Sequence, residues 1–179
     1  MTNRVKTVQN PKMILVACKD SERIAGIISA VLNECKYNTC IDDYYLNTDF
    51  IIVNYSERTE YPDDVIADTV VFDGEHDIEE SDVSRFRTKV GTYEYAYKRY
   101  GDDSKSVLTY SAENYAADIT CRNISLTCSG TAFDIIDNGI LSRVNIGTNL
   151  YTVDEVLVCT AVLTATGVPL ASVIGYFNR

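Results

Sequence analysis

The stretch that decides the fold lies at residues 13–43 and reads MILVACKDSERIAGIISAVLNECKYNTCIDD. It opens with the apolar run MILVA, which is typical of a strand buried on both faces of a parallel sheet. The polar segment CKDSER follows, and from Ile24 onward apolar residues recur at spacings of three and four, which predicts an amphipathic helix. A strand, a short loop and a helix in this order form the layout of a phosphate-binding unit, whose loop is rich in glycine and carries a lysine followed by serine or threonine. Here no glycine precedes Gly26, and Glu22 lies where a cation is expected.

Further short apolar runs predict more strands of the same kind. They lie at 48–56, 67–74 and 106–111, and a shorter strand-like segment lies at 37–43. The polar segment at 78–103 contains scattered aromatic residues, and we expect a surface helix within it.

The C-terminal third changes character. Alternating residues at 117–146, with Ser-Gly at 129–130 and Asn-Gly at 138–139, predict antiparallel strands joined by hairpins. An apolar helix is expected at 152–168, with Thr152 and Glu155 as a capping box, and a shorter helix at 169–177. The chain is therefore expected to form a three-layer α/β domain with a mostly parallel sheet and a small antiparallel edge sheet.

Length and composition limit the classes of protein that this chain can represent. Its 179 residues suit one domain, which we place at 13–179 after a polar N-terminal arm at 1–12. The net charge of −10 argues against a nucleic-acid partner. No apolar run approaches the roughly 20 residues of a membrane span, and the N-terminus lacks the apolar stretch of a secretory signal.

The cysteines indicate a cytoplasmic protein with free thiols. All six lie outside any CxxC pair, and the only histidine, His76, is far from Cys35 and Cys40 in the sequence. A zinc site is therefore not expected, and no metal site is predicted.

Three segments of the sequence resemble the central, ATP-binding domain of the Mur ligases, the cell-wall amide-bond ligases with folate-polyglutamate relatives. KMILVACKDSERIAGIISAVLNECKYNT at 12–39 has the shape of the family's opening strand, loop and helix. VLTYSAENYAADITCRNISLTCSGTAFDI at 107–135 and NIGTNLYTVDEVLVCTAVLTATGVPLASVIGYF at 145–177 are similar to the family's C-terminal part of that domain. The resemblance covers about residues 12 to 177 and implies a P-loop-like domain of the bacterial peptidoglycan ligases.

The family's nucleotide loop, GTNGKT, is the part that does not match. Glu22 replaces the lysine, which puts an anion beside the polyphosphate, and two unit charges at 4 Å interact by about 4 kcal/mol at an effective dielectric near 20. Arg23 replaces the threonine that holds magnesium, and it has no oxygen to offer the metal. Lys19 or Arg23 can still attract an anion to the helix N-terminus. The degenerate loop positions are Cys18, Lys19, Asp20, Ser21, Glu22 and Arg23.

The resemblance points to five further cleft positions. Asn54 takes the place of a glutamate that contributes to a metal site, and His76 lies in a segment similar to an Asp-His region. Lys98 is one residue away from a lysine that family members carbamylate. Asn149 and Tyr151 match an element near the adenine site, and helix entry and packing are the alternative explanation for both.

Two functions follow from the resemblance. The first is a degenerate ligase-like domain, or pseudoenzyme, that has lost ATP binding and amide-ligase activity and acts as a binding or regulatory module. It would have no cofactor, a protein partner or self-association, and room for a small-molecule ligand in the ligase cleft. The alternative is one component of an ATP-dependent ligase of acids and amino acids, with ATP and magnesium as cofactors and its other domains on separate chains.

Overall fold

A computed structural model describes residues 10–43, 47–55, 65–76 and 78–179 of the chain. Nine strands form one sheet in the order β2-β3-β1-β4-β5-β6-β7-β8-β9. All neighbours from β2 to β7 pair in parallel, and β7, β8 and β9 pair antiparallel. The strands are β1 (Lys12–Ala17), β2 (Thr39–Ile41), β3 (Phe50–Asn54), β4 (Ile66–Phe72), β5 (Thr88–Thr92), β6 (Val107–Ser111), β7 (Ile119–Thr127), β8 (Gly130–Asp137) and β9 (Ile140–Gly147).

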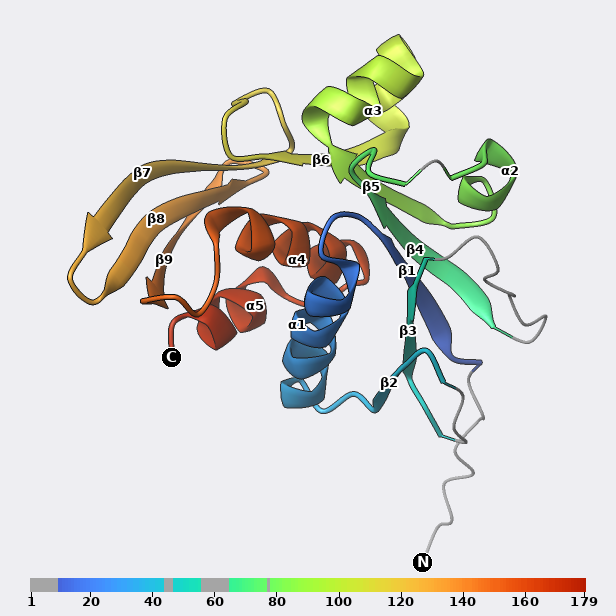
Figure 1. Cartoon of the computed structure of the whole chain (residues 1–179), viewed down its shortest axis with the longest axis horizontal. Coiled ribbons are helices and arrows are strands. Elements are labelled where there is room, and N and C mark those ends of the chain that lie inside the picture. Colours follow the sequence, from blue (N-terminus) through green and yellow to red (C-terminus); the bar gives the residue numbers. More distant parts are fainter. Residues whose placement is uncertain (1–9, 44–46, 56–64, 77) are drawn as a thin grey trace, which may run out of the picture.

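Helices cover both faces of this sheet (Figure 1). One face carries α1 (Ser21–Glu34), α4 (Val153–Ala165) and α5 (Leu170–Phe177). The opposite face carries α2 (Glu80–Val83) and α3 (Tyr93–Tyr100), which is followed by the 3-10 helix η1 (Gly101–Ser106). The three-layer α/β architecture with an antiparallel edge is confirmed.

The strand β1 lies in the parallel part because its residues are apolar on both faces. Ile14 and Val16 pack into the core shared with α1, α4 and α5, whereas Leu15 and Ala17 pack into the core under α2 and α3. Its neighbours β3 and β4 pair with it over most of its length. The continuous apolar run at 13–17 therefore contributes side chains to both hydrophobic cores of the domain.

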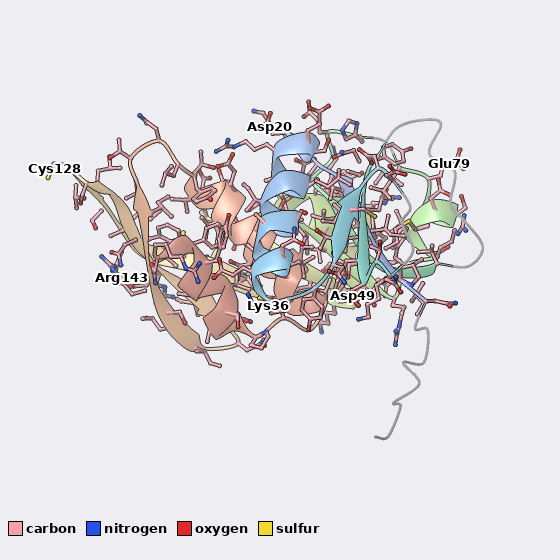
Figure 2. The ribbon with its side chains drawn as sticks, turned by 90° about the horizontal axis from the view of Figure 1, so that it is seen from below. Asp20, Lys36, Asp49, Glu79, Cys128 and Arg143 are labelled. Atoms are coloured by element: carbon pink, nitrogen blue, oxygen red, sulfur yellow. The ribbon has the colours of Figure 1, made fainter. Side chains whose placement is uncertain are left out.

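The antiparallel part packs against α4 and α5 through core residues of β7, β8 and β9, and the end of its β7–β8 hairpin projects beyond these helices (Figure 1). Cys128 lies at the tip of the β7–β8 hairpin (Figure 2). Asn138 and Gly139, with φ of 48° and 80°, turn the chain between β8 and β9. Both residues have the positive φ that a two-residue hairpin turn requires, so the Asn-Gly prediction is confirmed.

Two details of the sequence prediction can be compared with the structure. The capping box of Thr152 and Glu155 is present at the start of α4. The segment at 78–103 holds the expected surface helix α3, but it also holds the strand β5, which the sequence analysis missed. Only Val90 and Gly91 of β5 are buried, so the strand has no apolar run to reveal it.

The N-terminal boundary remains a prediction. Residues 1–9 of the predicted arm lie outside the described residues, and β1 already begins at Lys12. No helix in the described ranges has the length and apolar character needed to cross a membrane.

Candidate functional site

A cavity of about 530 Å³ lies where the parallel strands end. The carboxyl ends of β1, β4, β5 and β6 and the first turns of α1, α3 and α4 border it, which is the position where open α/β sheets bind ligands. Its lining residues are Cys18, Lys19, Asp20, Ile24, Asp73, Thr92, Glu94, Tyr110, Ser111, Ala112, Glu113, Thr152, Asp154, Glu155 and Val158.

The loop between β1 and α1 is held by a carboxylate from the neighbouring strand. The Lys19 backbone N–H donates to Asp73 Oδ2 over 2.7 Å, and the Glu75 N–H donates to Asp73 Oδ1 over 2.9 Å. Asp73 follows β4, which pairs directly with β1, so the sheet itself brings this carboxylate to the loop. A backbone amide of the loop is thus already bonded to an anion of the protein.

The start of α1 has no side-chain cap. Asp20 precedes the helix with φ 56° and ψ 37°, in the left-handed region, and its side chain makes no capping hydrogen bond. Figure 2 shows Asp20 at one end of α1 and Lys36 just past the other end. Because the first turn of any helix has backbone N–H groups without intrahelical partners, this end of α1 keeps donors available.

Arg23 links the loop to the start of α4. Its guanidinium donates to both carboxylate oxygens of Glu155 and to the Leu150 carbonyl, the latter over 2.7 Å. Glu155 also accepts a hydrogen bond from the Thr152 backbone N–H over 2.7 Å. Partial burial raises the pKa of Glu155, but the hydrogen bonds from Arg23 and Thr152 outweigh it and hold this pKa below its ordinary value.

Negative charge dominates the wall of the cavity. Six of the lining residues are acidic. Lys19 is the only lysine or arginine among the described residues that line the cavity. The carboxylates of Asp20, Glu113 and Asp154 form no hydrogen bond or ion pair with another residue of the described ranges. Glu94 accepts only a hydrogen bond from the Ser111 hydroxyl, over 3.3 Å.

Two weakly acidic groups lie at the bottom of the cavity. Cys18 is buried, and this burial, followed by the nearby Asp73 and Asp20 carboxylates, raises the pKa of its thiol to about 12. Tyr110 on β6 is 7% exposed, and its burial first, followed by the nearby Cys18 and Asp73 groups, raises the pKa of its phenol well above the ordinary value. Both groups are therefore neutral near pH 7.

The structure brings most of the sequence-predicted positions around two further depressions next to this cavity. All six loop residues from Cys18 to Arg23, together with Glu75 and His76, line one of them. Asn149 and Tyr151 line the other with Arg23. The Tyr151 ring also packs on Phe177 at 5.2 Å between ring centroids, which agrees with a packing role.

Asn54 and Lys98 lie apart from the cavity. Asn54, at the end of β3, donates to Asp42 through its backbone and its side-chain amide, over 2.8 Å and 2.6 Å. Its side-chain oxygen is buried without a partner among the described residues. Lys98 lies on the exposed side of α3 and does not line the cavity at the strand ends.

The sequence analysis missed most of the acidic wall. Asp73, Glu94, Glu113 and Asp154 carry no short motif, and only Asp20, as a loop position, and Glu155, as part of a capping box, were noted. A usable signal was present, because Asp73 lies at the end of one predicted strand segment and Glu113 follows closely after another. In the described part of the chain, no three His, Cys, Asp or Glu side chains are grouped closely enough to hold a metal ion.

Comparisons of the sequence find neither a matching family model nor a matching curated protein. Comparisons of the structure find several ligases. UDP-N-acetylmuramoyl-L-alanyl-D-glutamate–2,6-diaminopimelate ligase is similar over 97% of this chain and 47% of its own, with a TM-score of 0.70 and 12% identity. The MurF ligase from Thermotoga maritima, solved in complex with ADP, covers 92% of this chain and 48% of its own, with a TM-score of 0.62 and 9% identity.

Folylpolyglutamate synthetase from Lactobacillus casei is similar over 96% of this chain and 63% of its own, with a TM-score of 0.62 and 9% identity. The chain thus spans about half the length of the Mur ligases that it matches. At these identities the similarity establishes the fold. The chain has the α/β fold of the Mur ligases, as its sequence predicted.

Proposed function

We propose that this chain is a ligase-like domain that no longer holds a nucleotide and acts as a binding module. The observation that carries the proposal is the hydrogen bond from the Lys19 backbone N–H to the Asp73 carboxylate. In a phosphate-binding loop such amides face the phosphate oxygens. Here the Asp73 carboxylate accepts the hydrogen bond that a phosphate oxygen would accept in such a loop. A polyphosphate would have to displace this carboxylate.

The side chains around the loop also disfavour Mg-ATP. Glu22 puts a negative charge in the first turn of α1, and Arg23 is engaged by Glu155 rather than directed at a phosphate. Phosphoryl transfer depends on cations that neutralise the phosphates. The residues present therefore do not fit ATP and magnesium.

The alternative is a component of an ATP-dependent amide ligase whose other domains lie on separate chains. One observation favours it: the first turn of α1 is not capped by a side chain, so its amides can still attract an anion. One structure of similar fold, the MurF ligase from Thermotoga maritima, is described with ADP bound. The two proposals differ directly in their prediction for nucleotide binding.

We further propose that the module self-associates in the cytoplasm. Several large apolar side chains of the antiparallel part are exposed, with Leu126 on β7 at 84% and Ile140 and Leu141 on β9 at 60% each. Such surfaces are often covered by a second protein. Light scattering at increasing protein concentration tests this, and a monomer at the highest concentration would contradict it.

Thermal unfolding with and without millimolar Mg-ATP tests the loss of nucleotide binding. A ligand at 100 times its Kd stabilises the native state by about 2.7 kcal/mol, which gives a clear shift of the midpoint. We expect no shift for the unmodified protein. A shift would instead support the split ligase.

A loop variant makes this test sharper. Glu22→Lys combined with Arg23→Thr restores the cation and the hydroxyl that the family's loop carries, and we expect this variant to respond to Mg-ATP more than the unmodified chain. Asp103→Asn is the control for the net change of +1 in charge, because Asp103 is exposed in η1 and does not line the cavity. An equal response from the control would show that only the overall charge matters.

A further inference from the structure

The residues that line the cavity carry more negative charge than the helix N-termini around it can offset. Three helices, α1, α3 and α4, begin at the cavity, and each N-terminus carries the equivalent of roughly +0.5 charge. Together with Lys19 and Arg23 they offset about three and a half of the six negative charges. A net charge of about −2.5 is left inside a concave site, and its negative potential attracts cations.

Four carboxylates that form no ion pair within the described residues come from different sides of the cavity. Asp20 precedes α1, Glu94 belongs to the first turn of α3, Glu113 follows β6 and Asp154 belongs to the first turn of α4. They surround the space rather than converge at one point, in keeping with the lack of a metal-binding group among the described residues. A ligand that carries several positively charged groups at separate positions matches this arrangement.

Tyr110 gives an independent indication of a ligand. Its side chain is more than nine-tenths buried and lines the cavity, yet its hydroxyl makes no hydrogen bond with any described residue. The hydroxyl oxygen is not fully enclosed by the described protein atoms, so it can pair with a group that enters the cavity. Asp154 contributes to the electrostatic environment of the phenol, which is neutral near pH 7 and can accept a hydrogen bond from an ammonium group.

We infer that this cavity binds a small linear polyamine, with one ammonium group between the Tyr110 hydroxyl and Asp154 and another beside Glu94 and Glu113. The volume of about 530 Å³ falls within the range of small-molecule sites. The inference rests on the proposed function, because it requires that the strand ends are not occupied by a nucleotide.

Isothermal titration calorimetry with spermidine tests this inference on the full chain at about 0.15 M salt, where weak surface attraction is screened. We expect saturable binding of one spermidine per chain. 1,8-Octanediol, which has the alkyl chain but no charge, should give no binding. Absence of spermidine binding, or binding without saturation, would overturn the inference.

Two variants locate the binding. Tyr110→Phe removes a hydroxyl that has no partner in the described structure, so the protein should fold as before while spermidine affinity falls about tenfold. Asp154→Asn should weaken binding by a similar factor. Asp103→Asn, which makes the same change of charge in the exposed helix η1, should leave the affinity unchanged.

The controls separate a site from the general attraction of an acidic protein. If Asp103→Asn weakens spermidine binding as much as Asp154→Asn does, or if Tyr110→Phe changes nothing, the inference is wrong. A parallel titration with Mg-ATP reports on the proposed function alone. Stabilisation by Mg-ATP contradicts the loss of nucleotide binding, whereas a missing spermidine response overturns the polyamine site only.

Discussion

The helices α1 and α4 both begin at the cavity, and they begin in different ways. At α4 the Thr152 hydroxyl accepts from the Glu155 N–H over 3.1 Å, while the Glu155 carboxylate accepts from the Thr152 N–H. At α1 the preceding residue, Asp20, has a left-handed backbone and no capping bond. The start of α4 is thus specified within four residues, whereas the start of α1 depends on Asp73 and on distant contacts. The loop of the candidate site is held by tertiary structure.

The largest expected effect comes from removing the carboxylate that holds the loop at α1. Asp73→Ala leaves two backbone N–H groups, of Lys19 and Glu75, without their acceptor. A hydrogen bond to a charged group contributes about 1.5–3 kcal/mol, and because both donors belong to exposed residues and can be hydrated, we expect a total loss of about 2 kcal/mol in unfolding free energy. Urea unfolding measures it.

Asp73→Asn is the matched control, since its amide oxygen can still accept one of the two bonds. It should therefore lose less stability than Asp73→Ala. If Asp73→Ala unfolds at the same urea concentration as the unmodified chain, the loop is not held by this carboxylate and the comparison between the two helix starts fails.

The next effect concerns the cap of α4. Thr152→Ala removes the hydroxyl that accepts from Glu155 N–H, and loss of such a cap costs about 1 kcal/mol. Thr152→Ser keeps the oxygen and should retain most of the stability. Unfolding of both variants in urea checks the prediction, and an equal loss in the two would mean that the threonine methyl group matters more than the cap.

A pH titration sharpens the link between the two helix starts. Because the pKa of Glu155 is lower in the folded chain than its ordinary value, its ionised form stabilises the fold. This contribution is complete above the unfolded pKa of about 4.3 and is lost as the pH falls through the folded pKa. Unfolding free energies measured from about pH 6 to pH 3 should therefore fall less steeply for Glu155→Gln than for the unmodified chain.

Arg23→Met provides the second arm of this titration. Without its guanidinium the pKa of Glu155 should rise towards the ordinary value, and the pH dependence of this variant should approach that of Glu155→Gln. A pH profile that Arg23→Met leaves unchanged would show that the Thr152 hydrogen bond alone lowers the pKa.

The smallest expected effect has the opposite sign. Asp20→Gly places glycine at φ 56°, where it relieves the cost of a left-handed backbone but adds freedom to the unfolded chain. We expect a net stabilisation of about 0.5 kcal/mol or less, measured by urea unfolding. Asp20→Ala should destabilise. A loss for Asp20→Gly as large as that for Thr152→Ala would indicate that Asp20 does cap α1.

The elements of the fold could largely be predicted because their signals are local. The run at 13–17, the Asn-Gly turn at 138–139 and the capping box at 152–155 each depend on residues within a few positions of one another. The strand β5 was missed for the same reason, since only Val90 and Gly91 are buried and its place in the sheet depends on β4 and β6.

By itself the sequence determined the α/β class, most of the elements and the altered loop at 18–23, because side-chain periodicity and loop chemistry depend on consecutive residues. The tertiary structure alone decided how that loop is held and what surrounds it. Lys19 meets Asp73 across 54 positions of sequence, and Arg23 meets Glu155 across 132. Such contacts follow from which strands are neighbours and where their ends meet, and no local pattern of residues encodes that meeting.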